Sequence, residues 1–93
     1  MRQIAILSSF ERSVKKLNQQ DKRKLVVGLE ALNEFLLTGQ NSAGFGFKKI
    51  NHDQYEFRVD IRLRVVLKGE GDIFYLVLAG NHDDIRKYLR DYR

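Results

Sequence analysis

The sequence of 93 residues contains no cysteine and no proline. The absence of cysteine excludes disulfide bonds and thiolate metal sites, which fits a reducing cytosol. No apolar stretch approaches the roughly 18 residues of a membrane-spanning helix, and the apolar part of the opening MRQIAILSS is too short for a signal peptide. There is no low-complexity segment and no internal repeat. We therefore expect residues 1–93 to form a single cytoplasmic domain.

The composition is typical of a folded chain, with 43% hydrophobic and 31% charged residues. A net charge of +5 favours an acidic partner, which would be a nucleic acid, an acidic protein or an anionic lipid surface. The alternative is that the excess of lysine and arginine serves only solubility.

The first half of the chain has the periodicity of two helices. Ser8 and Glu11 have the spacing of a capping box for a short helix. Asp21 is a candidate cap for a longer helix, and Gly39 is well placed to end it. The connection at residues 18–20 is short, so we expect the two helices to form a hairpin. Their apolar stripes consist of Phe10, Val14 and Leu17, and of Leu25, Leu29, Leu32 and Leu36.

The second half alternates between apolar and charged residues, as a strand with one face in a core does. In YEFRVDIRLRVVLK (residues 55–68) every odd position is apolar and every even position except Val66 is charged. We expect two strands joined by a tight turn near Asp60, and a second turn at the Gly-Glu-Gly-Asp of residues 69–72. Residues 73–79 are apolar throughout, which predicts a central strand.

The remaining elements complete the predicted fold. Residues 4–7 are a candidate first strand, and residues 47–50 are a candidate strand before a turn at residues 51–53. Asp83 or Asp84 would cap a last helix. The expected class is α+β: a small antiparallel sheet of about four to five strands, packed against an N-terminal helical hairpin, with a short C-terminal helix.

The common catalytic and metal-binding motifs are not supported. Asn-His-Asp occurs at residues 51–53 and 81–83, but His52 and His82 are too few for a metal site, and both triplets suit a turn or a helix start. GFGF at residues 44–47 lacks the frame of a phosphate-binding loop, and no hydrolase motif surrounds a serine. We predict neither a metal nor a cofactor.

The charged face of residues 55–68 is the strongest functional signal. Arginine binds phosphate oxygens through two parallel hydrogen bonds, so a cluster of arginines on one sheet face suits RNA. The alternative is a solvated face with pairs such as Glu56–Arg64 across the hairpin. His82 follows the apolar strand and could exchange protons near neutral pH, although a lone histidine is more often structural. Four further basic residues near this face are candidates for binding RNA: Lys48, Lys49, Arg62 and Lys68.

Several segments resemble, in order, the RelE/ParE superfamily of bacterial toxins. These segments are FERSVKKL, FKKI, YEFRV, RLRVVL and LAGNHDDIRKYL, and the resemblance covers nearly the whole chain. It implies the toxin of a type II toxin–antitoxin module, inhibited by a cognate antitoxin. It also implies endoribonuclease activity on mRNA at the ribosome, through 2′-OH attack on the adjacent phosphate and without a metal.

The resemblance also implies roles for individual residues. Arg64, in RLRVV, would stabilise the phosphorane, and Arg58 on the preceding strand would assist it. His82 would act as general acid, with Tyr88 as a weaker match to a C-terminal tyrosine. Glu56 stands where other members have a lysine, so either Glu56 takes the base role or the chain cleaves RNA poorly. We expect Arg58 and Arg64 to project from one exposed face with His82 at its rim.

Departures from the pattern leave two alternatives. Some members carry a glutamate base where this chain has Phe45 or Gly46. The chain could therefore be a ParE-like toxin that inhibits DNA gyrase, or a basic binding module without catalysis. In each toxin case, Tyr88, Tyr92 and the basic surface would favour an acidic, amphipathic antitoxin segment.

Overall fold

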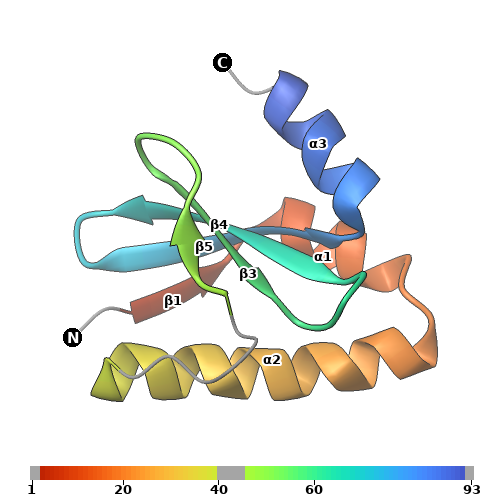
Figure 1. The fold of residues 1–93 in the computed structure, drawn as a ribbon, viewed down its shortest axis with the longest axis horizontal. Coiled ribbons are helices and arrows are strands. Elements are labelled where there is room, and N and C mark those ends of the chain that lie inside the picture. The colour runs from red at the N-terminus through yellow and green to blue at the C-terminus, as the bar shows by residue number, and fades with distance from the viewer. Residues whose placement is uncertain (1–2, 40–45, 92–93) are drawn as a thin grey trace.

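The computed structural model describes residues 3–39 and 46–91, so Phe45 and Tyr92 lie outside the described part. The elements are, in order, β1 (Gln3–Ile6), α1 (Ser8–Lys15), α2 (Gln19–Thr38), β2 (Lys48–Lys49), β3 (Gln54–Arg58), β4 (Arg64–Glu70), β5 (Ile73–Gly80) and α3 (His82–Asp91). A sheet lies between helices, with α2 along one face and α3 rising from the other (Figure 1). The predicted α+β class and the short C-terminal helix are confirmed.

The strands form one sheet in the order β1-β5-β4-β3-β2. This sheet is mixed rather than wholly antiparallel, because β1 runs parallel to β5, with Gln3 opposite Ile73 and Ile6 opposite Leu76. The other neighbouring pairs are antiparallel. The central position predicted for residues 73–79 is confirmed, since β5 pairs with both β1 and β4.

Both predicted turns of the alternating region are present. The Asp60 carboxylate accepts hydrogen bonds from the backbone N–H groups of Arg62 (2.8 Å) and Leu63 (2.6 Å), which closes the connection between β3 and β4. Gly71 lies in the turn between β4 and β5 with φ of 60°, a conformation that favours glycine. Ile61 departs from the alternation, because it lies in the first turn and is 84% exposed.

The alternation sorts β3 and β4 into two cores, one on each face of the sheet. On the α2 face, Phe57 and Val65 are buried with Leu32. On the α3 face, Val66 is buried with Val77 and Ile85. Because successive strand residues point to opposite faces, the charged even-numbered residues share the α3 face with Val66. The helix α3 therefore covers part of the face that the charge pattern singled out.

The predicted N-terminal caps are wrong, for α2 by three residues and for α3 by two or three. The side chain of Asn18, not Asp21, caps α2, by accepting a hydrogen bond of 2.7 Å from the Asp21 N–H. In α3, Asn81 and Asp84 each accept a hydrogen bond from the other's backbone N–H, at 2.9 and 3.0 Å, as in a capping box. The capping box predicted at Ser8 is not formed, because Ser8 already lies inside α1.

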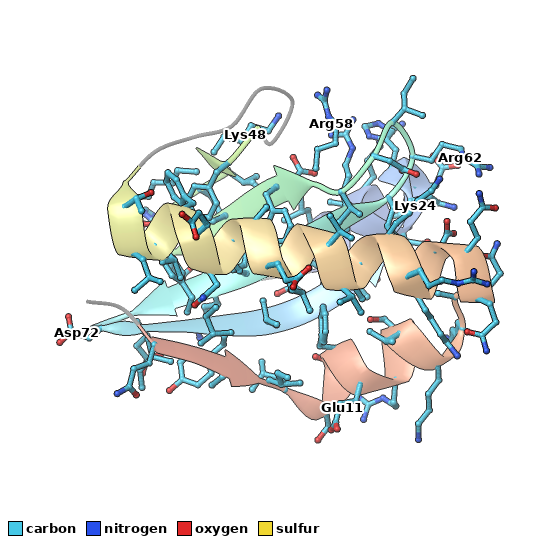
Figure 2. The ribbon with its side chains drawn as sticks, turned by 90° about the horizontal axis from the view of Figure 1, so that it is seen from below. Glu11, Lys24, Lys48, Arg58, Arg62 and Asp72 are labelled. Atoms are coloured by element: carbon cyan, nitrogen blue, oxygen red, sulfur yellow. The ribbon has the colours of Figure 1, made fainter. Side chains whose placement is uncertain are left out.

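The predicted helical hairpin is not clearly formed. The helix α1 runs along β5, where the Ser9 hydroxyl donates to the Val77 carbonyl (2.7 Å) and the Ser13 hydroxyl accepts from the Ala79 N–H (3.0 Å). The helix α2 instead crosses the sheet, as Figure 2 shows, and ends at Gly39 as predicted, with φ of 75°. No helix in the described ranges is both long and apolar enough to cross a membrane.

Candidate functional site

The centre of the candidate site is a pair of arginines that face each other across β3 and β4. Arg58 and Arg64 are direct partners in the antiparallel register. Side chains of such partners begin about 4.5–5.5 Å apart at Cβ, and like charges at this distance destabilise a sheet. Arg58 is exposed, whereas the Arg64 side chain is only 20% exposed. The pair thus concentrates positive charge, and the repulsion between its two guanidinium groups is unfavourable for the fold.

A buried carboxylate balances part of this charge. Glu56, only 6% exposed, lies two residues before Arg58 on the same face. Its two oxygens are 3.4 Å from Arg64 Nη1 and 3.5 Å from Lys48 Nζ. The Glu56–Arg64 pair weighed above as a structural alternative is therefore present. Glu56 contacts one end of the Arg64 guanidinium. Arg58 makes no ion pair with another described residue.

The same face holds two buried polar atoms that have no hydrogen-bond partner among the described residues. One is Arg64 Nε, so the sequence-based expectation of a freely exposed Arg64 is wrong. The other is Nε2 of Gln54, which is fully buried two residues before Glu56. Buried polar groups nearly always have partners, so an orphan usually marks strain, function or a missing ligand.

The predicted RNA-binding residues are not all brought together. Lys48 and Arg58 lie along the same edge of the molecule, while Arg62 lies at the end of the β3–β4 connection (Figure 2). Lys68 contacts Glu70 at 3.9 Å, further along β4. Lys49 is separated from them, because its Nζ lies 6.0 Å from the Tyr55 ring, and Tyr55 belongs to the α2 face.

The C-terminal candidates reach the site through α3. His82 is the first residue of α3 and is exposed, two residues after Gly80, which is the partner of Arg64 in the register of β4 and β5. His82 and Arg64 are therefore on the same side of the sheet. Tyr88 is half-buried on α3, and its hydroxyl donates to Gln54 Oε1 at 3.4 Å. The fold thus places both residues on the α3 side of the sheet, with the Tyr88 hydroxyl beside Gln54, four residues before Arg58 on β3.

A cleft of about 930 Å³ lies between α1 and α3. Leu17, Leu63, Leu78 and Ala79 contribute an apolar surface to it. Four basic residues also line it, and none of them makes an ion pair with another described residue. These residues are Arg12, Lys16, Arg62 and Lys87. Tyr88 lines the cleft as well, so the cleft and the arginine site share one side chain.

Within the described ranges there is no cluster of three or more histidine, cysteine or acidic residues that could hold a metal. No protein-family model matches the sequence. No curated protein sequence matches it either.

Solved structures match the chain over most of its length. The chain is similar to the E. coli DinJ–YafQ complex, with a TM-score of 0.68, 17% identity, and coverage of 91% of this chain and 98% of the matched one. It is also similar to the RelB–RelE antitoxin–toxin complex of Methanococcus jannaschii, with a TM-score of 0.67, 15% identity and coverage of 90% and 96%. The chain has the RelE/YafQ toxin fold.

A third similar structure is the YoeB dimer of Staphylococcus aureus, with a TM-score of 0.63, 18% identity, and coverage of 87% of this chain and 97% of the other. The resemblance inferred from short sequence motifs is thus confirmed at the level of the RelE-like fold. At these identities the similarity concerns the fold, so the roles of individual residues rest on the geometry described above.

Sequence reasoning missed two parts of the site. Gln54 precedes the alternating stretch and carries no charge, so nothing in the pattern singled it out. The sequence also does not reveal the basic residues Arg12, Lys16 and Lys87 as part of a site, because only the packing of α1 beside β5 brings Arg12 and Lys16 near α3. The basic character of FERSVKKL was the one available signal.

Proposed function

We propose that the chain is the toxin of a type II toxin–antitoxin module and acts as an endoribonuclease on mRNA at the ribosome. The observation that carries this proposal is the Arg58–Arg64 pair, opposed in register and only partly neutralised by Glu56. A phosphate with its charge spread over several oxygens is the natural ligand of two adjacent guanidinium groups. The RelE-like fold, shared with proteins described as toxins in complex with antitoxins, supports the same function.

In the proposed reaction, Glu56 takes the proton of the ribose 2′-OH as the 2′-oxygen attacks the adjacent phosphorus, and the bond to the 5′-oxygen breaks. Arg64 and Arg58 stabilise the charge of the phosphorane, and His82 supplies the proton that the leaving 5′-oxygen takes up. Glu56 is held by two cations and is almost fully buried. Besides the base role predicted for it, this position suits Glu56 to orienting the Arg64 guanidinium.

Expression of the chain without its neighbouring genes tests the proposal. We expect growth arrest, and primer extension on cellular mRNA should show new 5′ ends in phase with codons. Arrest with a DNA-damage response and intact mRNA would instead indicate inhibition of DNA gyrase. Normal growth with intact mRNA would contradict both toxin activities and favour a basic binding module without catalysis.

We propose that an acidic, amphipathic segment of the antitoxin docks in the cleft between α1 and α3. Its apolar side chains would meet the apolar surface around Leu78, and its carboxylates would pair with the four basic residues, Arg12, Lys16, Arg62 and Lys87. The segment would also cover Tyr88, which joins the cleft to the arginine site. Inhibition would then follow from occupation of the cleft.

Charge reversal tests this docking mode. Arg12→Glu with Lys87→Glu should weaken the complex at least tenfold and leave the toxin active in the presence of antitoxin, because two attractive contacts become repulsive. Lys15→Glu is the matched control, since Lys15 is exposed on the same helix but does not line the cleft. Equal affinity for the cleft variant and the control would place the antitoxin elsewhere.

A further inference from the structure

Gln54 is the most unusual polar residue of the fold. It is fully buried at the start of β3, on the face that carries Glu56 and Arg64. Its Nε2 has no partner among the described residues, while its Oε1 accepts a hydrogen bond from the Tyr88 hydroxyl at 3.4 Å. A buried amide that is only half satisfied destabilises a protein, because its unpaired N–H group has lost its hydrogen bonds to water. An apolar residue of the same shape would suit the fold better.

The bond to Tyr88 gives this amide a use. Residues two apart on one face of a strand are separated by about 7 Å, so Gln54 brings the Tyr88 hydroxyl within one side-chain spacing of Glu56. Tyr88 belongs to α3, which also contacts this face through the apolar side chains of Ile85 and Leu89. Such contacts hold a helix in place, but they do not direct a phenol. The hydrogen bond supplies that direction.

We infer that Gln54 is a positioning residue, which fixes the Tyr88 hydroxyl at the edge of the phosphate site. This inference rests on the proposed function, together with the catalytic role that the resemblance to RelE-like toxins implies for Tyr88. Gln54 itself is covered and does not touch the substrate. Its effect on the reaction therefore passes entirely through Tyr88, which a double-mutant cycle can measure.

The kinetic test uses Gln54→Met, Tyr88→Phe and the double variant, with Tyr75→Phe as the control. Methionine keeps the shape of glutamine without its polar atoms, so the melting temperature should stay equal or rise. Cleavage should fall about tenfold in Gln54→Met, because a misplaced catalytic group loses about this much or more. The double variant should cleave no more slowly than Tyr88→Phe alone. Losses that multiply, or full activity of Gln54→Met, would overturn the inference.

A second measurement needs no cleavage. The Cζ resonance of Tyr88, identified by its absence in Tyr88→Phe, should move in Gln54→Met, and the side-chain amide resonance of Gln54 should move in Tyr88→Phe. Both should be unaffected by Tyr75→Phe. If the wild-type chain does not cut RNA, the proposed function fails while these shifts still test the positioning. Unchanged resonances in both variants would refute it even in an active toxin.

Discussion

Arg64→Ala separates the stability role of the arginine site from its catalytic role. Sequence alone assigns Arg64 to a solvated face, where its removal should change stability by no more than about 0.5 kcal/mol. In the structure the side chain is 20% exposed and contacts the buried carboxylate of Glu56 at 3.4 Å. Without Arg64, Glu56 keeps only Lys48, whose side chain is 63% exposed. The variant should therefore be less stable than a surface substitution.

The magnitude follows from two opposing contributions. Leaving a buried charged group with one partner fewer costs about 1–3 kcal/mol. Removing the repulsion with Arg58, the direct partner in the register, returns about 0.2–1 kcal/mol. The net loss of about 1–2 kcal/mol corresponds to a fall in melting temperature of about 4–16 °C in a domain of this size. The protein should still be folded at 25 °C, so its activity can be measured.

Thermal melting and RNA cleavage of the purified variants provide the two readouts. In a Glu56→Gln background, Arg64→Ala should lower the melting temperature much less, because no buried charge is left behind. With Glu56 intact, cleavage should fall about 100- to 1,000-fold in Arg64→Ala, as expected when a donor to a transition-state oxyanion is lost. The Glu56→Gln background serves only the melting readout, because Glu56 itself has a proposed role in cleavage. An equal melting shift in both backgrounds would show that the ion pair does not hold the fold. If folded Arg64→Ala cleaved RNA at the wild-type rate, the proposed phosphate site would be refuted.

Three further predictions concern the ends and turns around the site. The pKa of Asp60 is lowered from 3.8 to about 2, mainly by the hydrogen bond from Lys24. The stability this adds is present above pH 4 and should be lost as the pH falls towards 2. Because both side chains of the pair are partly exposed, screening by solvent limits this loss to about 0.5–1 kcal/mol in acid melts, and it should be much smaller in Lys24→Met. A Cβ on Gly80 would lie 2.8 Å from the Asp84 carboxylate, so Gly80→Ala should disturb the start of α3. The variant should lose about 1–2 kcal/mol of unfolding free energy in denaturant melts. Adding Asp84→Ala to this variant should lower its stability little further, because the cap is already disturbed. His82→Gln should slow cleavage while RNA affinity, measured by filter binding, stays unchanged, and an equal loss of both would contradict the proton-donor role.

The two faces of the hairpin could be predicted from sequence because strand geometry leaves a single choice. Alternation over residues 55–68 determines which side chains enter the α2 core. The turn at Asp60 keeps the odd-numbered residues of both strands on that same face. The structure adds that β4 carries a register shift between Val66 and Leu67 opposite β5. No residue type marks that irregularity in the sequence.

The errors arise where the sequence offers two equivalent solutions or depends on distant contacts. Asn18 and Asp21, like Asn81 and Asp84, are both good capping residues three positions apart, and in each case the first one caps the helix. The parallel pairing of β1 with β5 joins segments about 70 residues apart, which local periodicity does not report. The burial of Gln54 has the same cause, because it depends on where α3 lies over the sheet.

The distribution of unfavourable features decides between a solvated sheet face and a functional one. Two opposed arginines, a half-satisfied buried glutamine and an orphan guanidinium nitrogen all lie on the α3 face. Gln54 Nε2 and Arg64 Nε are the only buried side-chain nitrogen or oxygen atoms without a partner in the described part of the chain, so the α2 face contributes none. Chance strain would be spread over both faces, whereas local rules are broken together where a protein meets its ligand. An RNA phosphate would offset the charge of Arg58 and Arg64, which the fold alone leaves in excess.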